Sequence, residues 1–291
     1  MRFGPYSFKV SNQDKILFPE DEISKGDLLE YYMAISDYAL PYIENRPIAM
    51  HRFPDGIAGK DFFQKDIPAY FPSWIKRIDV AREEGSIKML LANNKATMAY
   101  LANQACIAPH AFLSKVPDLN IPDRIIFDLD PPEGRFDLVV AAAQGLKRII
   151  ESKGHTAFIM TTGSSGMHIY VPIRQEYSFE IVRDYAHMIC TQLSGHNPEL
   201  FTTEIRKEKR KGRLFLDYLR NSYGQHSIIP YGIRALPKAP VATPLLWEEI
   251  ENLPEGSRTF NLANIFSRLD TTGDVWKGMQ RHATVITPEV N

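Results

Sequence analysis

Asp123-Arg-Ile-Ile-Phe-Asp-Leu-Asp-Pro-Pro132 is the stretch around which the other motifs of this sequence are arranged. Its apolar run is short, β-branched and aromatic, and two prolines stop it, which predicts a buried strand. Because side chains alternate along a strand, Asp128 and Asp130 share a face at its carboxyl end. Neighbouring carboxylates are costly unless a cation lies between them, and oxygen ligands suit Mg²⁺ or Mn²⁺. For this motif alone, the alternative is a strand that runs into a solvated turn.

A third carboxylate has the same kind of setting. Arg213-Leu-Phe-Leu-Asp-Tyr-Leu219 is another short apolar strand, and Asp217 is its only acidic residue. If Asp217 faces the core, it needs a partner. Two carboxylates on one strand and one on a neighbour form a ligand set for two-metal phosphoryl transfer.

The chain lacks the overall positive charge that is typical of proteins that bind nucleic acid over their whole surface. The chain has 291 residues, 44% of them hydrophobic, and a net charge of −1. Basic residues gather locally, because Arg206 to Arg213 carries six Lys or Arg residues against one Glu. The two cysteines, Cys106 and Cys190, lie in apolar, helix-like contexts without metal-ligand spacing. No apolar run has the ~20 residues of a membrane span, so we expect a cytoplasmic protein.

The hydrophobic pattern predicts an α+β fold. We expect helices at about 25–43, 94–111, 136–153 and 179–193, a hairpin at 75–91, and buried strands at 156–160 and 169–172. Strand–helix–strand followed by helix–strand favours an RRM-like mixed sheet with flanking helices. We expect a single domain over 1–291, with an N-terminal lobe to about 120, a catalytic core at about 121–235 and a packing segment at about 236–291.

A second polar cluster lies between two of the expected strands. Thr162-Gly-Ser-Ser-Gly166 is followed by His168, and glycines and hydroxyls of this kind can surround a phosphate. The alternative is an ordinary Gly/Ser turn beside a satisfied histidine. Further on, Arg234 follows a strand-like run, where it can clamp a triphosphate or pair with a carboxylate. Phe62 and Phe63 precede Lys65, a pattern compatible with base stacking and a phosphate contact, or with two core phenylalanines.

In their order, these motifs resemble those of the archaeo-eukaryotic primase superfamily: Asp128-Leu-Asp130, then Gly163-Ser-Ser-Gly-Met-His168, then Phe215-Leu-Asp217. The resemblance is closest to the polymerase domain of bacterial ligase D and its stand-alone end-joining relatives, and it covers nearly the whole chain. Further stretches carry it: Asn12-Gln-Asp-Lys-Ile-Leu-Phe-Pro19, Arg46-Pro47, Arg52-Phe-Pro-Asp-Gly56, Phe62-Phe-Gln-Lys65, Leu101-Ala-Asn-Gln104 and Ile229-Pro-Tyr-Gly-Ile-Arg234. Two positions depart from the pattern, since Ser165 and His51 stand where relatives often have lysine.

The resemblance implies a role for each group of residues. Asp128, Asp130 and Asp217 would be the catalytic metal ligands, holding two Mn²⁺ or Mg²⁺ ions. The incoming nucleotide would be contacted by His110, Thr162, Ser164, Ser165, His168 and Arg234. DNA would be contacted by Lys15, Lys25, Arg52, Phe62, Phe63, Lys65, Arg206 and Arg210. In that set, Lys15 and Lys25 would hold a downstream 5′-phosphate, for which the amide groups at the start of a helix are also suited.

The implied activity is DNA-dependent nucleotide addition in prokaryotic non-homologous end joining, with NTPs preferred over dNTPs. The implied partners are DNA with a 5′-phosphate at a gap or broken end, a Ku-type end-binding protein and a separate DNA ligase. The hairpin near residues 81–90 resembles a loop that helps two DNA ends meet. The alternatives are a DNA primase, a metal-dependent nuclease and a non-catalytic nucleic-acid-binding module, although the last lacks the expected RNP aromatics.

Overall fold

A computed structural model of the chain describes residues 1–288, which form two compact units. The first unit comprises Met1–Val116, His226–Ala242 and Phe260–Arg268. The second comprises Pro117–Gln225, Thr243–Thr259 and the chain from Leu269 onward. The division expected near residue 120 lies close to the first of these boundaries, and the C-terminal segment contributes to both units. The single-domain organisation stays a prediction.

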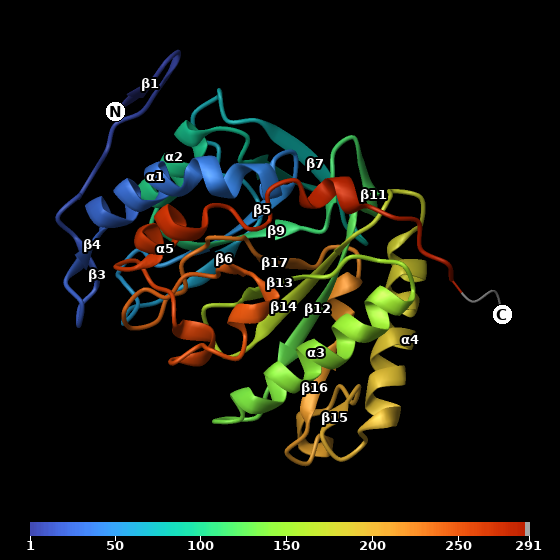
Figure 1. Ribbon diagram of the computed structural model, residues 1–291. Coiled ribbons are helices and arrows are strands. Elements are labelled where there is room, and N and C mark those ends of the chain that lie inside the picture. Colours follow the sequence, from blue (N-terminus) through green and yellow to red (C-terminus); the bar gives the residue numbers. More distant parts are fainter. Residues whose placement is uncertain (289–291) are drawn as a thin grey trace. The chain divides into compact units, whose positions relative to one another are not determined.

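The second unit is built on a sheet in the order β15-β16-β12-β14-β13-β18. Its elements are β12 (Arg124–Asp130), α3 (Phe136–Ser152), β13 (Phe158–Thr161), β14 (Met167–Pro172), α4 (Phe179–His196), β15 (Phe201–Thr202), β16 (Leu214–Asp217) and β18 (Pro244–Leu245). Strand β12 lies between β14 and β16 and is antiparallel to both. Helices α3 and α4 pack against each other and against β12 (Figure 1). This β-α-β-β-α-β arrangement confirms the predicted α+β fold with an RRM-like sheet.

Close packing of the two helices fixes this sheet from one side. The buried face of α3 carries Leu138, Ala142, Leu146 and Ile149 at helical spacing. At Gly145, a Cβ atom would lie 2.6 Å from the Leu193 side chain of α4, so glycine permits the close approach. Beneath the helices β12 is apolar throughout its middle, and each fully buried side chain there contributes about 1.5–3 kcal/mol. The polar carboxyl end of β12 is therefore held on a rigid support.

The first unit contains a second sheet in the order β17-β9-β5-β8-β7, with β6 paired to β5. Its strands are β5 (Pro47–Arg52), β6 (Phe62–Gln64), β7 (Arg77–Ala81), β8 (Ser86–Leu91), β9 (Cys106–Phe112) and β17 (His226–Ile228), and its long helices are α1 (Lys25–Ile43) and α2 (Lys95–Asn103). Strands β7 and β8 form the predicted hairpin. Helix α1 begins at a capping box, in which the Ser24 and Asp27 side chains accept hydrogen bonds from each other's backbone N–H.

The predicted helix at 94–111 is only half right. Helix α2 ends at Asn103, and the following residues form β9. Ala105 has a left-handed backbone (φ 53°), which ends the helix and turns the chain into the sheet. Strand β9 then pairs with β5 and β17 on its two sides. Alanine-rich sequence favours a helix locally, but pairing on both sides of β9 overrides that preference.

Shorter elements complete the chain: β1 (Arg2–Phe3), β2 (Tyr6–Ser7), β3 (Ile16–Phe18), β4 (Ile23–Ser24), β10 (Ser114–Lys115), β11 (Asp118–Pro122), α5 (Ile265–Thr272) and the 3₁₀ turns η1 (Lys207–Lys209), η2 (Leu219–Asn221), η3 (Trp247–Glu249), η4 (Gly256–Arg258) and η5 (Met279–His282). Cys106 and Cys190 are buried free thiols, and burial raises the pKa of Cys106 to about 12. Among residues 1–288, no helix has the length and apolar character needed to cross a membrane.

Candidate active site

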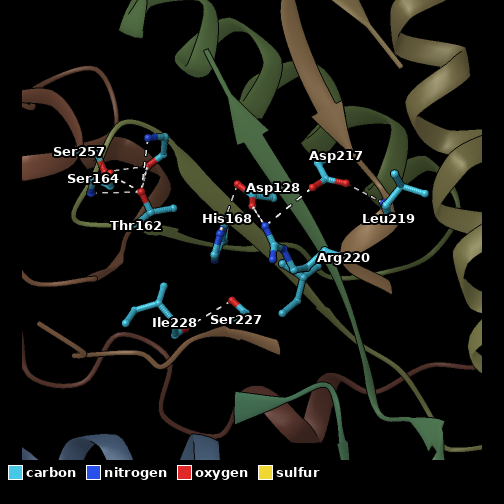
Figure 2. Close-up of polar contacts among 12 residues, drawn as sticks. Asp128, Thr162, Ser164, His168, Asp217, Leu219, Arg220, Ser227, Ile228 and Ser257 are labelled. Carbon is cyan, nitrogen blue, oxygen red and sulfur yellow. Dashed lines mark hydrogen bonds and ion pairs between the residues drawn. The ribbon is translucent and has the colours of Figure 1, made fainter. Parts of the chain in front are cut away.

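Three polar side chains lie in register across the centre of the second unit's sheet. Asp128 on β12 is the direct partner of His168 on β14 and of Asp217 on β16. Residues directly opposite in antiparallel strands share a face, so the three side chains gather on one side (Figure 2). His168 Nε2 lies 3.3 Å from Asp128 Oδ1. We call this set the Asp–His–Asp row.

Arg220, on the turn η2 after β16, balances the charge of this row. Its Nη2 lies 2.7 Å from Asp128 Oδ2 and 3.8 Å from Asp217 Oδ2 (Figure 2). Burial alone would raise the pKa of Asp128, but His168 and Arg220 outweigh it and hold that pKa well below its ordinary value. Asp217 behaves oppositely, because burial and the Asp128 charge raise its pKa. The Asp128 carboxyl group therefore loses its proton at a lower pH than the Asp217 carboxyl group.

Asp130 lies two residues beyond Asp128, on the same face, and meets the basic segment 206–213. Its Oδ2 lies 3.1 Å from Arg210 Nη1, and the Arg210 guanidinium stacks 3.9 Å from the Phe215 ring centre. Arg210 also donates to the carbonyls of Glu204 and Ile205, whereas Arg206 is exposed. A pocket of about 170 Å³ opens here, lined by Asp130, Pro131, Pro132, Glu133, Lys207, Arg210, Gly212 and Arg213.

The donor chemistry of these carboxylates fits a hard divalent cation. Asp128 and Asp217 offer oxygen ligands on opposed strand ends, and both already share one positive group, the Arg220 guanidinium. Asp130 follows at the same strand end with its own cationic partner. Within residues 1–288, no three acidic, histidine or cysteine side chains are arranged closely enough to enclose an ion as they stand. In this arrangement the guanidinium groups of Arg220 and Arg210 balance the negative charge of the carboxylates.

The loop 162–166 joins β13 to β14 and is fixed against the end of β12. A Cβ atom on Gly166 would lie 1.9 Å from the Leu129 carbonyl oxygen, so only glycine allows this approach. The Thr162 hydroxyl donates to the Gly166 carbonyl (3.0 Å) and accepts from the Ser164 N–H (3.2 Å). Thr162 thus shapes the loop from within. The Ser164 and Ser165 hydroxyls make no hydrogen bond in the part of the chain that the structure describes, and Ser165 is exposed.

The other two nucleotide-contact candidates, His110 and Arg234, belong to the first unit. His110 lies on β9, and its Nδ1 is 2.9 Å from the Ala108 carbonyl oxygen. Burial, followed by the nearby charge of Arg234 and by His226, lowers the pKa of His110 well below its ordinary value. The structure therefore brings His110 and Arg234 close together and keeps the imidazole neutral at physiological pH.

The two phenylalanines of β6 are exposed, which rules out their being core residues. Phe62 is 42% and Phe63 52% exposed. The His51 ring stacks on Phe63 with ring centres 4.0 Å apart, and the Arg52 guanidinium lies 5.4 Å from the Phe62 ring centre. Arg52 also donates to Gln104 and Gln64 and to the Tyr70 hydroxyl. Its guanidinium is therefore engaged in holding this surface together. Lys65 follows directly, and its pKa is lowered by partial burial and by Arg82.

Lys15 and Lys25, which we call the lysine pair, both have partners. Lys15 Nζ lies 2.8 Å from Asp55 Oδ1. Lys25 Nζ is buried and donates to the Ser11 hydroxyl and the Asn103 carbonyl, each at 3.2 Å. Burial, and then Lys15, lowers the pKa of Lys25.

The start of helix α1 does not offer amide groups to an anion, contrary to the expectation for Lys25. The N–H groups of Lys25 and Gly26 donate to the carbonyls of Lys15 and Gln13, and that of Asp27 donates to Ser24. The Asp27 carboxylate also lies in this first turn. The chain folds back on itself here, so the lysine side chains alone remain as candidate anion ligands.

The sequence motifs missed three residues that organise the site. Arg220 stands three positions after Asp217, a spacing that signals an ion pair only once the local turn is known. Asn221 fixes that turn, because its side-chain amide accepts from the Ile126 N–H and donates to the Ile126 carbonyl, both at 2.8 Å. Ser257 donates to the Gly166 carbonyl (2.7 Å) from a distant part of the chain, and no sequence signal pointed to it.

Comparison with known proteins identifies the family. Residues 24–276 match the family model of the LigD primase-polymerase domain. The chain is 33% identical over 246 residues to the bifunctional non-homologous end joining protein LigD of Bacillus subtilis, covering 84% of this chain and 39% of that protein. It is 30% identical to the multifunctional LigD of Mycolicibacterium smegmatis, covering 95% of this chain and 36% of that protein. The chain thus spans well under half the length of these relatives.

A solved structure agrees. The polymerase domain from Mycobacterium tuberculosis ligase D, in complex with DNA, superposes with a TM-score of 0.90 at 26% identity, covering 95% of this chain and 99% of that one. The resemblance to the ligase D polymerase domain that the motifs indicated is confirmed. The chain belongs to the LigD primase-polymerase domain family.

Proposed function

We propose that this chain is a DNA-directed nucleotidyltransferase of prokaryotic non-homologous end joining, which adds nucleotides to a primer 3′-OH at gaps or broken ends. The observation that carries the proposal is the Asp–His–Asp row, because it places two carboxylates and an imidazole in register beside the fixed loop 162–166. A rigid set of oxygen ligands next to a hydroxyl-bearing loop is what phosphoryl transfer from a triphosphate needs. The family assignment supports the same activity.

The residues have separable roles in this proposal. Asp128, Asp130 and Asp217 would hold two Mn²⁺ or Mg²⁺ ions, which would supply positive charge for activating the 3′-OH and for neutralising the pyrophosphate. His168 is held against Asp128 on the adjacent strand and contacts the triphosphate. Ser164 and Ser165 offer unbonded hydroxyls at the loop, while Thr162 keeps the loop in shape. His110 and Arg234 are the candidate nucleotide contacts of the first unit.

DNA recognition is assigned to groups that the nucleotide site does not use. Phe62 and Phe63 present exposed rings for base stacking, with Arg52 over the Phe62 ring, His51 against the Phe63 ring and Lys65 adding a cation. Arg206 and Arg210 belong to the basic segment and add a salt-dependent phosphate-binding contribution. Lys15 and Lys25 hold the 5′-phosphate of the downstream strand. NTPs are preferred over dNTPs, and in the cytoplasm a Ku-type end-binding protein and a DNA ligase act on the same ends.

Rival functions differ in what they need from this site. A non-catalytic RRM-type module needs exposed aromatic side chains on the central strands, yet Phe127 of β12 and Tyr170 of β14 are buried. A nuclease needs the carboxylates but has no use for the loop 162–166. A primase starts a new strand without requiring a 5′-phosphate.

Primer extension on a gapped duplex tests the proposal. The duplex is offered with and without the downstream 5′-phosphate, with Mn²⁺ or Mg²⁺, and with NTPs and dNTPs in parallel. We expect templated addition that the 5′-phosphate stimulates, with NTPs used more efficiently. Asp217→Asn serves as the inactive control. Primer degradation would indicate a nuclease, unprimed synthesis a primase, and binding without either reaction a non-catalytic module; each of these outcomes would overturn the proposal.

A further inference from the structure

The guanidinium of Arg258 contacts the loop 162–166 from a distant part of the second unit. Arg258, the last residue of turn η4, donates its Nε–H to the Ser164 carbonyl oxygen at 3.0 Å. The preceding residue, Ser257, donates to the Gly166 carbonyl and lies 3.2 Å from the Thr162 hydroxyl (Figure 2). Turn η4 therefore closes over the loop with two consecutive residues, although it lies more than ninety positions away in sequence.

The remaining groups at this loop are neutral. The five residues 162–166 carry hydroxyls and glycines but no charged side chain. The hydroxyls of Ser164 and Ser165 make no hydrogen bond among the described residues. Neutral donors alone bind a triphosphate weakly compared with charge-assisted donors. Arg258 is the cation that the structure places in direct contact with this loop.

The conformation of Arg258 leaves its forked end available. The side chain is exposed, and its Nη1 and Nη2 have no hydrogen-bond partner within residues 1–288. The hydrogen bond from Nε to the Ser164 carbonyl holds the guanidinium at the loop. A guanidinium with two free terminal nitrogens matches the two oxygens of a phosphate group.

The loop is also in contact with the strand that carries Asp128 and Asp130. Gly166 presses against the Leu129 carbonyl, between Asp128 and Asp130 in sequence. His168, two residues after Gly166, contacts Asp128. The carboxylates, the loop and Arg258 are thus linked by direct contacts within one unit.

We infer that Arg258 is a phosphate-binding residue of the nucleotide site, which contacts the triphosphate of the incoming nucleotide together with the Ser164 and Ser165 hydroxyls. The inference rests on the proposed nucleotidyltransferase function and extends it to a residue outside the three motifs. The competing explanation is that Arg258 only braces the loop through Nε. The two explanations differ in whether the positive charge matters.

Three variants separate charge from bracing. Arg258→Gln keeps a side-chain N–H donor for the Ser164 carbonyl and loses the charge, Arg258→Lys keeps the charge, and Arg258→Ala loses both. Arg148→Gln, an exposed arginine on α3 in the same unit, is the matched control. Thermal unfolding of each variant verifies that it is folded before any binding is compared.

The measurements are KM and kcat for NTP in primer extension, and calorimetric dissociation constants for inorganic tripolyphosphate and for NMP. We expect Arg258→Gln and Arg258→Ala to raise the KM for NTP and the dissociation constant of tripolyphosphate roughly 10- to 100-fold, the range for a charge-assisted hydrogen bond. NMP binding and kcat should change less than threefold, and Arg258→Lys should recover part of the loss, because lysine keeps the charge and lacks the fork of the guanidinium. Arg148→Gln should resemble the unmodified protein.

A glutamine variant that binds tripolyphosphate as tightly as the unmodified protein would overturn the inference. So would an equal loss of NMP and tripolyphosphate binding, because that is the signature of a collapsed loop. If the unmodified protein binds tripolyphosphate through Arg258 but extends no primer, the proposed function fails and the phosphate contact stands. If it extends primers and the Arg258 variants match it, only the inference fails.

Discussion

The Asp–His–Asp row and the lysine pair are both candidate ligand sites, but they hold their charges differently. In the row, each carboxylate faces a cationic or ionisable partner across a paired strand, and the backbone register fixes the spacing. In the lysine pair, Lys15 is tied to one exposed carboxylate and Lys25 is buried against neutral oxygens. A sheet therefore builds a charged site that stays in place without its ligand, whereas isolated lysines depend on side-chain contacts that a ligand can replace.

The largest expected effect is on catalysis at the row. Asp128→Asn or Asp217→Asn should reduce primer extension about 10²- to 10³-fold, the scale on which preorganised charge-stabilising groups act. Extension of a gapped duplex at saturating Mn²⁺ measures the loss. Asp137→Asn, which changes an exposed carboxylate paired with Arg135, should leave the rate unchanged. Near-normal rates in either row variant would show that these carboxylates do not hold the metals.

Substitutions in the lysine pair should affect binding of the 5′-phosphorylated DNA end and not the nucleotide-addition step. Changing both lysines to methionine should remove the preference for a 5′-phosphorylated end, a loss of about 10- to 100-fold in affinity for that end. Fluorescence anisotropy with 5′-phosphate and 5′-hydroxyl duplexes at fixed salt measures it. Lys95→Met, which removes a lysine paired with Asp37 in the same unit, is the control. If the unmodified protein binds both ends equally, the pair has no such role.

Removing the carboxylate that engages Lys15 should have a smaller effect of the opposite sign. Asp55→Asn releases Lys15 from its 2.8 Å ion pair, which is largely exposed. Since such pairs are worth about 0.2–1 kcal/mol, 5′-phosphate affinity should increase by up to roughly fivefold. The same anisotropy titration reports the change, and Asp37→Asn provides the matched comparison. Weaker binding by Asp55→Asn would show that Asp55 positions Lys15 for the phosphate.

The smallest expected effect is on the free energy of unfolding of the metal-free protein, on which the two carboxylates of the row act in opposite directions. Like charges directly opposite in a sheet destabilise by about 0.2–1 kcal/mol, so Asp217→Asn should stabilise the metal-free protein at neutral pH by that amount. Because the pKa of Asp217 is raised in the folded state, the gain should disappear as pH falls through that pKa, where the unmodified carboxyl takes up a proton.

Asp128→Asn should act in the opposite direction. The folded-state pKa of Asp128 is lowered, so its carboxylate stabilises the protein above the ordinary carboxyl pKa, and this contribution is lost at lower pH. The variant should therefore be destabilised at neutral pH. Urea unfolding of both variants from about pH 2.5 to 8, with a metal chelator, measures the pair. Equal changes of the same sign would contradict the assigned pKa directions.

The sequence predicted the strands that carry the carboxylates better than it predicted the surroundings of the lysine pair, for a physical reason. Alternation along β12 and β16 depends on local apolar pattern, so the common face of Asp128 and Asp130 followed from the sequence alone. The helix at 94–111 was half wrong because pairing of β9 with two strands is a long-range effect. Arg220 and Ser257 were missed because their partners depend on how a turn folds back.

Counting bound Mn²⁺ by electron paramagnetic resonance tests the central claim most directly. The titration uses the folded protein with gapped DNA and a triphosphate analogue that cannot be cleaved. The account predicts two bound ions per chain in the unmodified protein, and fewer or more weakly bound ions in Asp128→Asn and Asp217→Asn. An unchanged number and affinity of ions in both variants would contradict the assignment of Asp128 and Asp217 as metal ligands.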